Sequence, residues 1–196
     1  TFLNAFTYPD KTMYPVSSRN DKDYMNLISV YMDAVFQPAI YTNPNIFLQE
    51  GWHYQIHDVN EEMEYSGVVL NEMKGAFSSV DETIVDELNR MLFPDNCYKY
   101  VSGGDPRYIT DLTYEQFIET HQKFYHPSNA RVWVDGNLDI DEVLRFIHEE
   151  YFVNYQKEDM DFAIPMQKVL PAVHNRIFYE VSENEPTENR SHISFA

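Results

Sequence analysis

The stretch "YSGVVLNEMKGAF", residues 65–77, decides how this chain is interpreted, because it places a carboxylate among the apolar positions of a predicted helix. At about 100° per residue, its apolar side chains fall on one broad arc of the helix. They are Val68, Val69, Leu70, Met73, Ala76 and Phe77. Glu72 falls inside this arc, between Val68 and Ala76. The periodicity therefore predicts that Glu72 faces inward, and an inward-facing carboxylate needs a partner.

The residues alone leave three partners open for Glu72. It could pair with an arginine, cap the backbone of a loop, or bind a metal ion. The surrounding sequence does not choose among them.

Composition limits the classes of protein to which the chain can belong. It has 196 residues, 43% of them hydrophobic, and a formal net charge of −18. This acidity argues against nucleic acid and anionic membranes as partners, because both need basic patches. It fits a soluble protein, or one that attracts basic peptides. The single cysteine, Cys97, excludes an internal disulfide. The opening "TFLNAFTYPD" has neither an initiator Met nor a signal peptide, so we expect a fragment.

Local patterns predict an α+β fold. Residues 2–16 predict two strands around a "YPDK" turn, and further strands are expected near Trp52, at 129–136 and at 175–181. A helix with Asn20 or Asp21 as its cap is predicted after residue 20, and capping boxes at Ser79 with Glu82 and at Thr113 with Gln116 predict two more. Residues 139–152 predict an amphipathic helix with acidic residues in its first turn. Helices and strands alternate irregularly and include a hairpin, which favours α+β over a doubly wound parallel sheet.

Other residues that could carry chemistry have simpler explanations. His53 and His57 are four residues apart, but the segment alternates as a strand does, which separates them by about 13 Å, too far to share an ion. Cys97 has no neighbouring base in the sequence. The "SGGDP" loop lacks a phosphate-loop lysine and predicts a tight turn. The acidic set near residue 62 predicts a solvated face: Glu61, Glu62 and Glu64.

Five phrases in a fixed order carry a family resemblance. They are "TFLNAFTYPDKTMYPV", "QEGWHY", "GVVLNEMKGAF", "SGGDP" and "YHPSNARVWVDGN". Together they resemble the presequence-protease and falcilysin branch of the pitrilysin/insulinase zinc peptidases. The resemblance implies an incomplete repeat of that type, with a mainly antiparallel sheet packed against helices. It covers residues 1–155 as the greater part of a first catalytic repeat, 156–172 as a linker, and 173–196 as the opening strand of a second repeat.

The resemblance gives Glu72 a role. In this family a helix with the pattern H-x-x-E-H supplies two zinc ligands and a general base. The glutamate of "NEMKG" on a second helix is the distal zinc ligand, and it corresponds to Glu72. No H-x-x-E-H pattern occurs in this chain. The resemblance therefore implies one ligand of three and no catalytic residue here, and we expect the isolated chain to be inactive and to hold no zinc.

The resemblance also implies a substrate-binding strand at "LNAFT". Asn4 and Ala5 match positions that contact the backbone of an extended peptide, and Phe6 matches a residue near the cleavage-site pocket. The alternative is an ordinary hairpin strand with Phe6 in the core.

The expected function is that of a fragment of a zinc metalloendopeptidase that hydrolyses unstructured peptides inside an enclosed chamber. The alternatives are a non-catalytic scaffold repeat of the same superfamily and an acidic module that binds calcium or another partner. The expected partners are unstructured peptides, the remaining repeats of the polypeptide and, for the isolated chain, further copies of itself. We expect a cytoplasmic protein, with the mitochondrial matrix or plastid stroma as the alternative.

Overall fold

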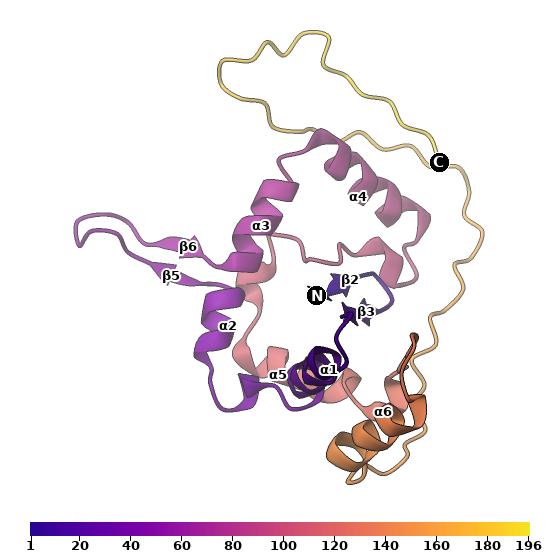
Figure 1. Ribbon diagram of the computed structural model, residues 1–196. Coiled ribbons are helices and arrows are strands. Elements are labelled where there is room, and N and C mark those ends of the chain that lie inside the picture. Colours follow the sequence, from indigo (N-terminus) through magenta and orange to yellow (C-terminus); the bar gives the residue numbers. More distant parts are fainter. The chain divides into compact units, whose positions relative to one another are not determined.

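The computed structural model describes residues 1–196 and shows a mixed α+β chain with six α-helices and three two-stranded antiparallel sheets (Figure 1). The chain forms two compact units, which are described separately. The first unit consists of residues 1–7, 12–48 and 112–162, and the second of residues 8–11, 49–111 and 163–196.

The N-terminal strands confirm the predicted hairpin. β1 (Phe2–Leu3) pairs with β4 (Val16–Ser17), and β2 (Phe6–Thr7) pairs with β3 (Thr12–Met13), both antiparallel. At the predicted turn, the Tyr8 backbone N–H donates to the Lys11 carbonyl oxygen at 2.8 Å. The hairpin is therefore a narrow ribbon of paired two-residue segments.

The core of the first unit lies between α1 (Asp21–Phe36) and α6 (Ile140–Ile147). Asn20 caps α1 as predicted, because its side chain accepts a hydrogen bond from the Asp23 backbone N–H. The buried side chains at the centre of the core come from both helices: Ile28, Val143 and Ile147. A π-helix (His148–Phe152) continues α6, and the Tyr151 hydroxyl donates to the Ser29 carbonyl oxygen at 3.0 Å.

α5 (Tyr114–Phe124) is attached to α1 through His121. Its ring Nε2 lies 2.9 Å from the Val35 carbonyl oxygen, and its Nδ1 lies 2.6 Å from the Tyr41 hydroxyl. Because Nε2 faces a carbonyl, it carries the proton, and Nδ1 accepts from Tyr41. The same unit holds η1 (Ala39–Tyr41), η4 (Pro127–Asn129) and most of α2 (Asn45–Glu50).

The second unit is built around a ribbon and two helices. β5 (His53–Gln55) and β6 (Glu64–Ser66) form a hairpin that extends away from α3 (Val68–Ala76), as Figure 1 shows. Gly67 joins β6 to α3 where the backbone passes very close to Gly51, and a Cβ on Gly67 would lie 2.1 Å from the Gly51 oxygen. α4 (Val80–Leu92) follows, with η2 (Cys97–Lys99) and η3 (Ile109–Asp111).

Two predicted strands do not form. Residues 130–135 and 175–181 adopt neither helix nor strand, and the same holds for all of residues 156–181. A β-prone segment becomes a strand only when another backbone pairs with it, and none does so here. None of the helices combines the length and the apolar composition that a membrane span requires.

Candidate functional site

α3 places Glu72 on its exposed side. The helix starts directly after Gly67, whose carbonyl oxygen accepts from the Asn71 backbone N–H at 2.9 Å. Leu70 is fully buried and anchors the helix, whereas Val68 is 52% exposed and Glu72 is exposed. The Glu72 side chain is therefore available to a partner from outside this unit.

The prediction that Glu72 faces inward is wrong for this chain. The apolar arc of α3 spans about 200°, and Leu70 and Val68 lie at its two ends. Burial decreases along the arc from Leu70, which is fully buried, through half-buried side chains to Val68, which is exposed. The half-buried side chains are Phe77, Met73, Val69 and Ala76. Glu72 lies near the uncovered Val68 end. Periodicity identified the arc correctly, but it does not say which part of a broad arc is covered.

Glu72 stands apart from other metal-binding side chains in the structure. No group of three or more His, Cys, Asp or Glu side chains is arranged to hold a metal ion. An exposed carboxylate of this kind is chemically suited to one position in a zinc site. The structure does not test the assignment of Glu72 as a zinc ligand, which stays a prediction.

The two histidines of the hairpin differ in their place on the ribbon. His53 lies in β5, and His57 lies beyond its end. The His57 Nε2 atom is 3.3 Å from the Gln55 side-chain nitrogen and 4.0 Å from a Glu64 carboxylate oxygen. The strand assigned to this segment from its alternation is confirmed.

The predicted substrate strand is exposed. Asn4 and Ala5 lie between β1 and β2, and Phe6 opens β2 with 40% of its surface exposed. The Asn4 backbone N–H donates to the Pro15 carbonyl oxygen at 3.2 Å, and its side-chain oxygen accepts from the Ala5 backbone N–H at 2.8 Å. The alternative that buries Phe6 in the core is therefore wrong. Asn4, Ala5 and Phe6 belong to the first unit and Glu72 to the second.

An ion-pair cluster in the second unit was missed from sequence. The loop "SGGDP" was expected to be only a turn, yet its Asp105 accepts from Arg107 Nε at 2.9 Å and from Arg90 Nη2 at 3.0 Å. These bonds, led by those from Arg107, lower the pKa of Asp105 to about 2, although partial burial opposes the shift. Arg90 also pairs with Asp86 at 3.0 Å, and the other carboxylate oxygen of Asp86 is buried without a hydrogen bond.

The cluster connects α4 to the "SGGDP" loop at residues 102–106. Arg90 bonds to Asp86 one turn earlier in α4 and to Asp105 in the loop, so one guanidinium joins both. Only the pair four residues apart on the helix could have been found from sequence. The contact across 15 residues depends on the path of the chain.

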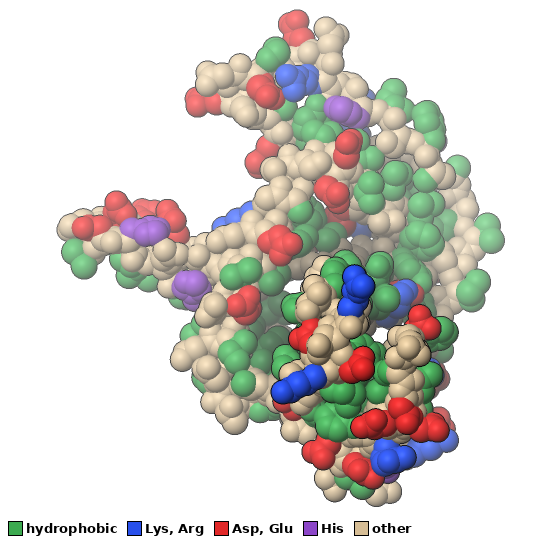
Figure 2. Space-filling model, viewed as in Figure 1, with side chains coloured by type: hydrophobic (Ala, Val, Ile, Leu, Met, Phe, Trp, Pro, Cys, Tyr) green, Lys and Arg blue, Asp and Glu red, His purple; other side chains and the backbone are tan.

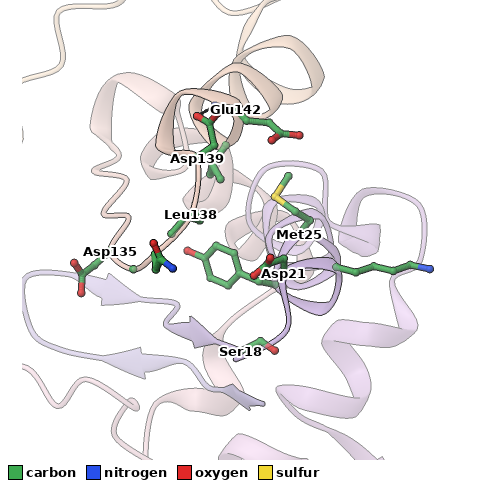
Figure 3. Close-up of a pocket in the computed structure, with 12 residues that line it drawn as sticks. Ser18, Asp21, Met25, Asp135, Leu138, Asp139 and Glu142 are labelled. Atoms are coloured by element: carbon green, nitrogen blue, oxygen red, sulfur yellow. Dashed lines mark hydrogen bonds between the residues drawn. The ribbon is translucent and has the colours of Figure 1, made fainter.

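A pocket of about 340 Å³ lies in the first unit, between α1 and the start of α6 (Figure 3). Met25 lies on the α1 side, with Leu138 on the opposite wall. Its carboxylates come largely from the N-terminal ends of the two helices, where negative charge interacts favourably with the positive end of the helix dipole. Asp139 caps α6 by accepting from the Glu142 backbone N–H at 3.1 Å. Helix starts thus account for three of the four acidic residues that line the pocket, Asp21, Asp139 and Glu142, whereas Asp135 lies in the loop before α6.

The structure defines a mixed α+β chain, and comparison with known proteins gives its family. A family model described as "Peptidase M16 inactive domain" matches residues 111–196. Protein HypA of Clostridium perfringens is 49% identical over 195 residues. Presequence protease 1, chloroplastic/mitochondrial, of Arabidopsis thaliana is 51% identical over 149 residues, and the mitochondrial presequence protease of Mus musculus is 44% identical over 170.

The chain belongs to the pitrilysin/insulinase family, peptidase family M16, which confirms the resemblance. These matches cover 99%, 76% and 85% of the chain, respectively. The chain spans 20% of the length of the HypA relative, and 14% and 16% of the two presequence proteases. Most of each relative therefore lies outside the matched region.

Proposed function

We propose that this chain is part of a zinc metalloendopeptidase that hydrolyses unstructured peptides within an enclosed chamber. The observation that carries the proposal is the 51% identity to a presequence protease over a region that includes the "NEMKG" motif. The chain contributes Glu72 as one zinc ligand and Asn4, Ala5 and Phe6 as a strand along which the peptide lies. We place the protein in the cytoplasm. The alternative is an organelle matrix, which the organellar names of the two presequence proteases support.

The geometry supports these roles at the level of each residue. Glu72 is exposed on a helix that Leu70 anchors, so its carboxylate can turn to an ion without unfolding α3. β2 pairs with β3 along one edge, and its other edge carries no strand. A peptide could add there by main-chain hydrogen bonds. Bound zinc would acidify a water molecule for attack on the peptide bond.

The test replaces Glu72 in the full-length protein that contains this chain. Glu72→Gln keeps the size of the side chain but removes the charge that binds zinc. We expect it to lower zinc content and peptide hydrolysis together, with activity falling at least about a hundredfold and the circular dichroism spectrum unchanged. Glu119→Gln, at an exposed position on α5, is the matched control and should retain both. A Glu72→Gln protein with full zinc and full activity would refute the ligand assignment.

A non-catalytic scaffold repeat is the second candidate, and one observation favours it. The family model that matches residues 111–196 describes an inactive domain. The intact "NEMKG" motif favours the peptidase instead, because a scaffold has no need of that carboxylate. The two candidates differ in the gene: an H-x-x-E-H pattern encoded upstream of Thr1 supports the peptidase, and its absence from the whole reading frame supports the scaffold.

A further inference from the structure

The N-terminal hairpin is joined to α5 through the side chain of Tyr14, within the first unit. Tyr14 lies on the returning arm of the hairpin, between β3 and β4, and is half-buried. Its hydroxyl lies 2.6 Å from the hydroxyl of Tyr125 at the end of α5, so one of them donates to the other. Burial and this bond raise the pKa of Tyr14, so its hydroxyl keeps its proton at neutral pH.

The Tyr125 ring is itself held in place by His121. The two residues are four apart, which puts them on one face at the end of α5, and their rings stack at 4.3 Å between centroids with 16° between planes. His121 contacts the Val35 carbonyl oxygen through Nε2 and the Tyr41 hydroxyl through Nδ1. Because both ring nitrogens are engaged, Tyr125 packs against a ring that cannot turn freely.

The contact leads directly to the predicted substrate strand. Pro15 follows Tyr14 in the chain, and its carbonyl oxygen accepts from the Asn4 backbone N–H at 3.2 Å. The position of Asn4 therefore depends on the arm that Tyr14 fixes. The base of the hairpin has a separate attachment, because Asp23 accepts from the hydroxyls of Thr1 and Ser18 at 2.7 and 2.6 Å.

We propose that Tyr14 and Tyr125 are positioning residues for peptide binding, whose paired hydroxyls hold the returning arm so that residues 4–6 are ordered before a peptide arrives. This inference rests on the proposed function, because it concerns the strand that we assign to the peptide. A strand that is ordered in advance binds more tightly, since the peptide does not have to order it. The two tyrosines act through Asn4 and not through the zinc ligand Glu72.

The kinetic test uses the full-length protein that contains this chain and a quenched-fluorescent, unstructured basic peptide. Tyr14→Phe and Tyr125→Phe each keep the ring and remove one hydroxyl. We expect KM to rise roughly threefold to tenfold, the size of one lost hydrogen bond, with kcat and zinc content unchanged. The double variant should match the single variants, because all three lack the same bond. Tyr100→Phe, which removes an exposed hydroxyl of the second unit, is the matched control and should change nothing.

Hydrogen–deuterium exchange of residues 2–7 in the same proteins gives a readout that does not require activity. Exchange there should be faster in the two single variants and equally faster in the double variant, because the Asn4 N–H loses protection when the arm moves. The Tyr100→Phe protein should exchange as the unchanged protein does. A merely structural role of the tyrosines in packing would not predict this change, since the Phe variants keep both rings.

The outcomes separate this proposal from the peptidase function. Normal hydrolysis with unchanged KM in both single variants would overturn the positioning role and leave the function intact. Equal losses in kcat and zinc content would also overturn it, because the pair would then support the whole fold. If the full-length protein hydrolyses no peptide, the function fails, and the dissociation constant of the labelled peptide decides: weaker binding in the Phe variants supports the positioning role, and equal binding overturns it.

Discussion

At the residue scale, Glu72 is exposed where its position in the sequence suggested that it would be buried. Its place in the apolar arc of α3 suggested a buried carboxylate, which would be costly without a partner. In the structure it is exposed, so it bears no such cost and the fold does not require a partner for it. An exposed carboxylate on an anchored helix is free to bind an ion when other ligands approach it.

Asp105 gives the clearest pH prediction. Its pKa lies at about 2 in the folded chain, below its ordinary value of 3.8, mainly because Arg107 donates hydrogen bonds to it. A lowered pKa stabilises the fold above the unfolded pKa, and this stabilisation is lost as pH falls from about 4 to about 2. We expect the free energy of unfolding, measured with urea, to fall by on the order of 1–2 kcal/mol over that pH range because of Asp105.

Asp105→Asn separates this contribution from general acid effects. The variant should be less stable at pH 7 and should lose correspondingly less stability between pH 4 and pH 2. Asp159→Asn, at an exposed aspartate, should keep the behaviour of the unchanged chain. The Asp105 assignment fails if Asp105→Asn and the unchanged chain lose stability in parallel over that range.

At the scale of the element, α5 shows how local sequence sets a helix boundary. Thr113 Oγ1 accepts from the Gln116 backbone N–H at 3.2 Å, and the Gln116 side-chain oxygen accepts from the Thr113 backbone N–H at 2.9 Å. This reciprocal capping box was predicted and is confirmed. At Ser79 the structure shows the Ser79 bond to Glu82, without the reciprocal one.

Removal of the α5 cap should be measurable in the whole chain. Thr113→Ala leaves the Gln116 N–H without its acceptor and should lower the free energy of unfolding by about 1 kcal/mol. Thr113→Ser keeps the hydroxyl and serves as the control, with a change of less than half that size expected. Chemical denaturation monitored by circular dichroism provides the comparison, and equal stabilities for all three proteins would contradict the capping role.

The strands depend on more than local sequence. "NARVWVDG" and "NRIFYEV" are as β-prone as the segments that pair, yet neither is a strand here. Strand hydrogen bonds lie between segments, so the second backbone decides whether they form. The hairpins at residues 2–17 and 53–66 pair because a short loop brings their own partners back to them.

At the scale of the whole molecule, the chain has a formal net charge of −18, and part of its negative charge lies on the β5–β6 hairpin. Figure 2 shows acidic side chains gathered towards the far end of the β5–β6 hairpin. They are Asp58, Glu61, Glu62 and Glu64, and the hairpin contains no Lys or Arg. The predicted solvated face is confirmed, since Glu61, Glu62 and Glu64 are all exposed.

The isolated 196-residue chain should neither hold zinc tightly nor cleave peptides. A single carboxylate is too weak a site for the metal, because stable zinc centres use three or four protein ligands. After incubation with zinc and dialysis, metal analysis should give far less than one ion per chain. Glu72→Gln should give the same result. Stoichiometric zinc that survives dialysis and is lost in Glu72→Gln would contradict this prediction.

The sequence by itself determined the helices, their caps, the hairpins and the family, because these depend on neighbouring residues and on motifs that can be read along the chain. Only the tertiary structure decided that Leu70 rather than Glu72 faces inward, that Arg90 joins Asp86 to Asp105, and that residues 131–135 lack a partner. The reason is physical: burial, ion pairs across loops and strand pairing depend on which segment lies opposite, and that is set by packing in three dimensions.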